Sequence, residues 1–144
     1  KYITVHTNGG LDMLKAVKKK AKQINKNLKI LGVTVLTSLN ERSLKEIGYN
    51  NSVEKLVLKQ ADIIKKSGCD GVVCSAKEAK ILRNLHGDGF LLVTPGIRME
   101  SSHDDQIRVM RPDEAVSMGS NYLVVGRPIT KSNDPLDSLQ KMYD

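Results

Sequence analysis

The sequence predicts an α/β fold built on a parallel sheet, and three observations support this. Apolar stretches typical of strands alternate with helical patterns along the whole chain. Most of those stretches are apolar throughout rather than alternating, which is typical of strands covered on both faces. The polar segments with functional potential all follow strands. The chain has 144 residues and no linker or low-complexity stretch, so we expect a single domain over residues 1–144.

The first strands and helices are predicted from the opening of the chain. Residues 2–6 are strand-like, and Asn8-Gly9-Gly10 turns the chain into a helical pattern. The apolar residues of that pattern recur at helical spacing: Leu11, Leu14, Val17, Ala21 and Ile24. Residues 29–36 are rich in β-branched side chains and predict a second strand. Thr37-Ser38 is expected to cap a short helix that closes near Gly48.

The middle of the chain repeats the alternation. A longer helix is expected from about residue 52 to residue 67, and residues 71–75 predict a third strand. Ser75 then stands where it can cap a helix over residues 76–85. A nucleophilic Ser75 is not favoured, because no His–Asp pattern accompanies it. Residues 90–94 predict a fourth strand.

The C-terminal part begins with the longest irregular segment. Residues 95–110 are polar, and loops of this length in compact domains are usually functional or disordered. Pro112 stands where the first residue of a helix belongs, and Gly119 ends that helix. Residues 122–126 predict a fifth strand. A last helix is marked by its apolar residues: Leu136, Leu139 and Met142.

Composition limits the classes of partner. Lys and Arg number 23 against 16 Asp and Glu, a net charge of +7, so anionic partners are expected. Nucleic acid is disfavoured, because one Phe, no Trp and four Tyr offer few stacking platforms. Lys18-Lys19-Lys20 is interpreted as a solvated helix face. Cys69 and Cys74, with no signal peptide, predict reduced thiols and a cytoplasmic location, and no apolar run is long enough to span a membrane.

Two strand ends combine glycine with arginine. Gly126-Arg127 follows the apolar run of the fifth strand, and Gly96 and Arg98 follow the fourth. Glycine lets a ligand approach the backbone closely, and arginine can hold a phosphate with two N–H groups. Either end alone is typical of an ordinary turn. Together they predict convergence on one phosphate-bearing ligand.

The predicted order of elements fits part of a (β/α)8 barrel. In that fold the C-terminal ends of the strands build the active site, with phosphate bound after the last two strands. Here about five strand–helix units are present, so the barrel is expected to be partial. An open doubly wound sheet is the alternative. Asn8-Gly9-Gly10 is a poor match to the glycine-rich turn which that fold carries after its first strand.

A set of motifs carries a resemblance to a known family. They occur in this order: Val33-Thr-Val-Leu-Thr37-Ser38, Gly71-Val-Val-Cys-Ser75-Ala, Val93-Thr-Pro-Gly-Ile-Arg98, Asp104-Asp-Gln106 and Val125-Gly-Arg-Pro-Ile-Thr130. Together they resemble orotidine 5′-phosphate decarboxylase in its bacterial form, over nearly the whole chain. The resemblance implies a (β/α)8 barrel, a dimer with active sites at the subunit interface, and neither metal nor cofactor. The implied reaction converts orotidine monophosphate to uridine monophosphate and CO₂ in pyrimidine synthesis.

The resemblance also implies roles for individual residues at the phosphate. Arg127 and the backbone of Gly126 would bind it, and Gln106 from the long loop would close over it. Arg98 would serve the same side of the ligand. From the residues alone, Gln106 is only a polar side chain in a loop.

Two further positions are implied at the rest of the nucleotide. Pro95 would line the pyrimidine pocket, and Thr37 would contact the nucleotide. His6 faces the site in the family, although a single strand-end histidine is more often a packed or capping residue. His103 with Asp104-Asp105 lacks a fourth ligand at suitable spacing, so a solvated loop is favoured there over a metal site.

The family's catalytic signature, Asp-x-Lys-x-x-Asp, is absent from residues 1–144. The chain resembles barrel strands four to eight only and begins at Lys1. Two interpretations stay open. In one, the chain belongs to a decarboxylase whose catalytic part is deleted, cleaved, disordered or separately supplied. In the other, it is a catalytically dead remnant that binds nucleotide phosphate or only self-associates. Either way we expect a homodimer, or pairing with the missing N-terminal segment.

Overall fold

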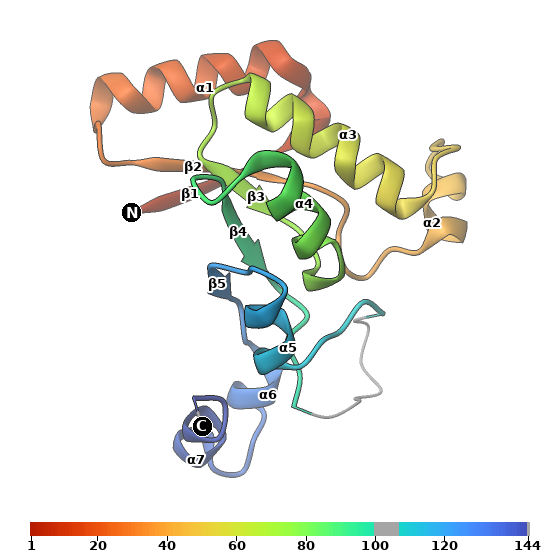
Figure 1. Ribbon diagram of the computed structural model, residues 1–144, viewed down its shortest axis with the longest axis vertical. Helices are drawn as coiled ribbons and strands as arrows, with labels where there is room; N and C mark the ends of the chain where they lie inside the picture. The colour runs from red at the N-terminus through yellow and green to blue at the C-terminus, as the bar shows by residue number, and fades with distance from the viewer. Residues whose placement is uncertain (100–106, 144) are drawn as a thin grey trace.

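The computed structural model describes residues 1–99 and 107–143. Within that part, one sheet of parallel strands runs in chain order (Figure 1): β1 (Tyr2–His6), β2 (Lys29–Val33), β3 (Gly71–Val73), β4 (Leu91–Thr94) and β5 (Tyr122–Leu123). Strands follow one another in this sequential order in a (β/α)8 barrel, whereas a doubly wound sheet reverses its order at a switch point. The parallel α/β sheet is confirmed, and its order is that of a partial barrel.

Helices separate the strands. The described helices are α1 (Gly10–Ile24), α2 (Glu41–Glu46), α3 (Val53–Lys66), α4 (Ala79–His86), α5 (Pro112–Ser117), α6 (Arg127–Thr130) and α7 (Pro135–Gln140), with 3₁₀ turns η1 (Thr7–Gly9) and η2 (Ala76–Glu78). Figure 1 shows α1 and α3 side by side over β1, β2 and β3, with α4 beside β4. No helix in the described ranges is both long and apolar enough to cross a bilayer.

The main core lies between the sheet and α1, α3 and α4. Leu14 of α1, Val57 of α3 and Leu82 of α4 are fully buried there, together with Val72 of β3 and Leu92 of β4. This apolar layer fixes one face of the strands, so the strand ends are held at a common edge. The two cysteines are buried free thiols, as expected, and burial raises the pKa of both.

The start of α2 differs from the prediction. Thr37-Ser38 does not cap it; the side chain of Asn40 does, accepting the N–H of Ser43 at 3.0 Å. Thr37 is instead buried, and its carbonyl accepts the N–H groups of Ile107 and Arg108, each at 3.3 Å. The prediction failed because several cap-forming residues stand in a row, and local sequence does not decide among them.

The C-terminal part packs less tightly than the rest. Strand β5 has only two residues rather than the five expected, and α6 was not predicted at all. Neither α6 nor α7 buries a residue, and Leu136 and Tyr143 are 80% and 82% exposed. Figure 1 shows α7 at the far end of the molecule from α1. This C-terminal part therefore presents apolar surface that the described residues do not cover.

Candidate functional site

The glycine–arginine segments leave the sheet at the same edge. Strands β4 and β5 are paired through Thr94 and Leu123, and the N–H of Val124 donates to the carbonyl of Thr94 at 3.0 Å. After β4 and after β5, the chain leaves the sheet in the same direction. Because the strands are parallel, their C-terminal ends, and the residues that follow them, lie on one side of the sheet.

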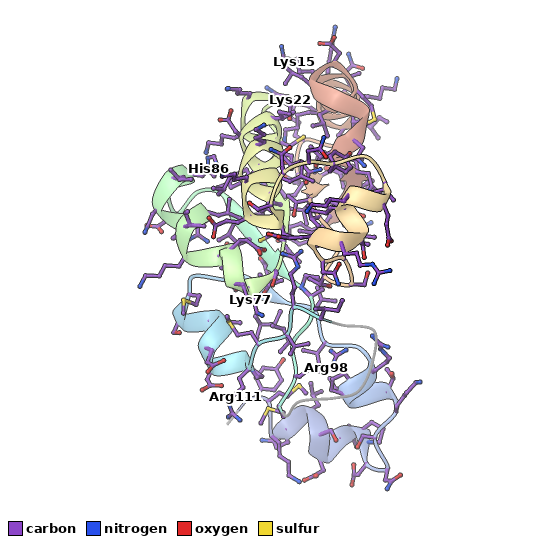
Figure 2. The ribbon with its side chains drawn as sticks, turned by 90° about the vertical axis from the view of Figure 1, so that its right-hand side faces the viewer. Lys15, Lys22, Lys77, His86, Arg98 and Arg111 are labelled. Carbon is purple, nitrogen blue, oxygen red and sulfur yellow. The ribbon has the colours of Figure 1, made fainter. Side chains whose placement is uncertain are left out.

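Arg98 is held in place by its backbone. Gly96 has φ of +80°, a conformation that favours glycine, and it turns the chain out of β4. Ile97 is fully buried, and Arg98 is 7% exposed with its Nη1 donating to the carbonyl of Ile97 at 2.8 Å. Figure 2 shows Arg98 in the narrow part of the molecule, between the sheet and α6–α7. A buried guanidinium at a strand end is suited to holding an anion.

Gly126 and Arg127 lie in the same part of the fold. Val125 packs against a small buried cluster that contains Ile97, so Arg98 and Gly126 each come one residue after a side chain of this cluster. Gly126 is exposed, and a Cβ built on it would meet nothing within 4 Å. Arg127 is half-buried in the first turn of α6. The Gly126 backbone is therefore open to a ligand beside an arginine.

The remaining predicted positions are placed unevenly. Thr37 is buried four residues after β2, and Pro95 is half-buried directly after β4. Gln106 lies outside the described residues, as do His103 and Asp104-Asp105. The described residues contain no group of three or more His, Cys, Asp or Glu that could hold a metal ion.

The other two candidates are Ser75 and His6. The Ser75 side chain accepts the N–H of Lys77 at 3.3 Å, so its predicted capping role is confirmed, although it caps the 3₁₀ turn η2 that leads into α4. His6 is exposed at the end of β1 and lines a pocket of about 160 Å³ together with Asn8 and Gln60.

A buried ion pair that the sequence did not reveal lies beneath these strand ends. Arg108 donates from Nη1 to Glu78 at 2.5 Å, and from Nη2 to the carbonyls of Val35 at 2.8 Å and Leu36 at 3.3 Å. Its side chain and that of Glu78 are 8% and 7% exposed. Burial raises the pKa of Glu78 although the charge of Arg108 opposes it. The sequence does not reveal this pair, because Glu78 and Arg108 lie 30 residues apart in the chain and no local pattern links them.

Comparison with known proteins shows which family the chain belongs to. The profile of the orotidine 5′-phosphate decarboxylase / HUMPS family matches residues 1–142. Orotidine 5′-phosphate decarboxylase of Hahella chejuensis is 45% identical over 141 residues, covering 97% of this chain and 60% of the relative. That of Staphylococcus epidermidis is 46% identical over 144 residues, covering 99% of this chain and 63% of the relative. The chain thus spans about three fifths of the length of the curated relatives it matches.

Solved structures show the same partial coverage. The crystal structure of orotidine 5′-phosphate decarboxylase from Lactobacillus acidophilus matches with a TM-score of 0.83 at 36% identity, over 99% of this chain and 62% of that one. The Sulfolobus solfataricus enzyme matches with a TM-score of 0.66 at 19% identity, over 98% of this chain and 59% of that one, which is a likeness of fold. By its sequence and its fold, the chain belongs to the orotidine 5′-phosphate decarboxylase / HUMPS family.

Proposed function

We propose that this chain is the phosphate-binding part of an orotidine 5′-phosphate decarboxylase, the enzyme that forms uridine monophosphate and CO₂ from orotidine monophosphate. The observation that carries the proposal is that Arg98 and Gly126-Arg127 follow adjacent parallel strands. The residues just before them, Ile97 and Val125, pack in one buried cluster. Two guanidinium groups and an open glycine backbone are suited to a phosphate dianion. The reaction itself is inferred from the names of the relatives.

Each predicted residue has a role in this proposal. Arg127 and the Gly126 backbone bind the phosphate, and Arg98 binds on the same side. Pro95 lines the pyrimidine pocket, and Thr37 contacts the nucleotide. Gln106 closes over the phosphate. We also propose a cytoplasmic location, which agrees with the buried free thiols of the chain.

Catalysis is not assigned to any residue of this sequence. Removing CO₂ from the pyrimidine leaves negative charge on a ring carbon, so a fixed cation and a proton donor must stand at that carbon. The family resemblance gives this role to the lysine of Asp-x-Lys-x-x-Asp, and residues 1–144 lack that signature. Binding without turnover is therefore the proposed capacity of this chain alone.

Calorimetric titration with uridine monophosphate tests the proposal. The wild-type chain should bind, and Arg127→Ala should weaken binding by about tenfold or more, since one charge-assisted hydrogen bond contributes about 1.5–3 kcal/mol. Arg42→Ala is the matched control, because its side chain is 88% exposed on α2. Equal affinity of wild type and Arg127→Ala, or no binding by either, would contradict the proposed site.

A second candidate function is association with a partner chain. Large apolar side chains are exposed along the open edges of the sheet and in the C-terminal part: Tyr2, Ile3, Tyr122, Val124, Leu136 and Tyr143. We propose that a second copy, or the family's segment absent from this sequence, covers them. Exposed strand edges and apolar surface of this kind favour pairing with another chain.

A further inference from the structure

Residues 107–110, here called the strap, lie across the ends of three strands. At its first end, the N–H groups of Ile107 and Arg108 donate to the carbonyl of Thr37, beyond β2. At its other end, Met110 forms a parallel bridge with Ile97 beyond β4. The strap therefore connects Thr37 to the neighbour of Arg98, and the proposed function assigns both Thr37 and Arg98 to the nucleotide.

The β4 end of the strap is fixed by two backbone hydrogen bonds. The N–H of Met110 donates to the carbonyl of Gly96 at 3.1 Å, and the N–H of Arg98 donates to the carbonyl of Met110 at 3.0 Å. Because the second bond involves Arg98 itself, a shift of the strap moves the backbone from which this arginine extends.

The side chain of Arg108 anchors the middle of the strap. Its two terminal nitrogens reach Glu78 of η2 and the carbonyls of Val35 and Leu36, just before Thr37. The Ser75 hydroxyl donates to the Arg108 carbonyl at 3.4 Å. One residue thus ties the chain after β2 to the turn after β3.

Arginine suits this arrangement better than lysine. Its planar fork carries N–H groups in fixed directions, so it can bond a carboxylate and two carbonyls at once, whereas a lysine ammonium is a single point.

We propose that Arg108, held by Glu78, is a positioning residue that sets Thr37 and Arg98 at their spacing for the nucleotide. This inference rests on the proposed function. It predicts that disturbing Arg108 weakens nucleotide binding by more than its effect on stability explains. A misplacement of about 1 Å in a binding group can lower activity about a hundredfold.

The matched control is Arg83. It is also a largely buried arginine, and it donates to the carbonyls of Gly87, Phe90 and Gly119. Those contacts lie around the beginnings of β4 and β5, away from the strand ends that hold the proposed site. Arg83→Lys should therefore cost stability through lost carbonyl bonds without moving the site.

The test compares Arg108→Lys with Arg83→Lys in the full chain, by thermal unfolding and by uridine monophosphate titration well below the unfolding temperature. At similar losses of stability, Arg108→Lys should bind about tenfold more weakly or worse, and Arg83→Lys should bind like the wild type. Hydrogen exchange at the Arg98 and Met110 amides should be faster in Arg108→Lys only. Equal affinity in Arg108→Lys and Arg83→Lys, with a binding wild type, contradicts the inference.

A double variant separates positioning from stability. Glu78→Gln with Arg108→Met removes both buried charges, so it should be more stable than Arg108→Met alone, which leaves Glu78 buried without its partner. Its affinity for uridine monophosphate should stay low, because methionine cannot hold the carbonyls of Val35 and Leu36. Recovery of both stability and affinity would show a merely structural pair. A wild-type chain that does not bind uridine monophosphate would instead contradict the proposed function.

Discussion

Tyr2 of β1 and Tyr122 of β5 are in contact although their strands form opposite edges of the sheet. Their ring centroids are 5.4 Å apart in an edge-to-face arrangement, and their hydroxyl oxygens are 2.8 Å apart. In a flat sheet with strands about 4.8 Å apart, the outer two of five would be about 19 Å apart. Two tyrosines could not meet over that distance, so the sheet is curved as in a barrel wall.

The tyrosine contact gives a spectroscopic prediction. The hydrogen bond with Tyr122 is the main reason that the pKa of Tyr2 is raised above its ordinary value. Tyr122→Phe should return the pKa of Tyr2 towards that value, as followed by ultraviolet-difference titration. Tyr143→Phe is the control, because Tyr143 is 82% exposed at the other end of the chain. An unchanged titration of Tyr2 in Tyr122→Phe would show that the two tyrosine side chains do not meet in solution.

Asp70 should give the chain a pH-dependent stability. Burial alone would raise the pKa of its carboxyl, but hydrogen bonds from Lys18, the Ile30 N–H and Lys29 outweigh this and hold the pKa below its ordinary value. A carboxyl with a lowered folded pKa contributes stability that is present above the unfolded pKa of about 3.9 and lost as pH falls through the folded pKa.

Replacement of Asp70 should therefore lower the stability of the fold at neutral pH and leave it unchanged in acid. Asp70→Asn should lower the free energy of unfolding by about 1–3 kcal/mol at neutral pH and flatten its decline below about pH 4. The control is Asp62→Asn, because Asp62 forms an exposed helix-surface pair with Lys66 and should contribute little. Urea unfolding across this pH range measures both. Identical profiles for Asp70→Asn and wild type would contradict the assignment.

Gly71 should tolerate no side chain. It begins β3 opposite Leu91 of β4, and a Cβ at Gly71 would lie 2.2 Å from the Leu91 carbonyl oxygen. Because backbone must move to relieve that contact, Gly71→Ala should cost about 1–3 kcal/mol or more. Gly89→Ala, where a Cβ meets nothing within 4 Å, should be close to neutral. Chemical denaturation compares them, and equal stability of the two variants would show that β3 and β4 are not packed as described.

The sequence could predict strands and helices wherever pattern and local chemistry agreed. Pro112 at the first turn and Gly119, with φ of +98°, bound the fifth predicted helix as expected. Helix α6 was missed because it has four residues and no apolar period. Arg98 and Gly126-Arg127 could be placed at strand ends from the sequence, because each follows an apolar run. Arg108 could not, because its role depends on carbonyls more than 70 residues earlier in the chain.

The isolated chain should not remain a monomer. Within the described residues, β1 pairs with β2 on one side and with no strand on the other. Apolar side chains on both edges of the sheet are about half exposed. Pairing with a second copy would remove this surface from water. Sedimentation should therefore show a species larger than 15.9 kDa, with larger species favoured at higher concentration. A compact monomer that unfolds cooperatively would contradict the expectation.

We expect this chain to bind a nucleotide phosphate without performing the reaction. Residues 1–144, purified free of host enzyme, should be mixed with orotidine monophosphate and the loss of substrate followed by absorbance. No turnover should be seen, although uridine monophosphate still binds in the parallel titration. Activity should appear only when a segment carrying Asp-x-Lys-x-x-Asp is added. Turnover by residues 1–144 alone, abolished in Arg127→Ala, would contradict it.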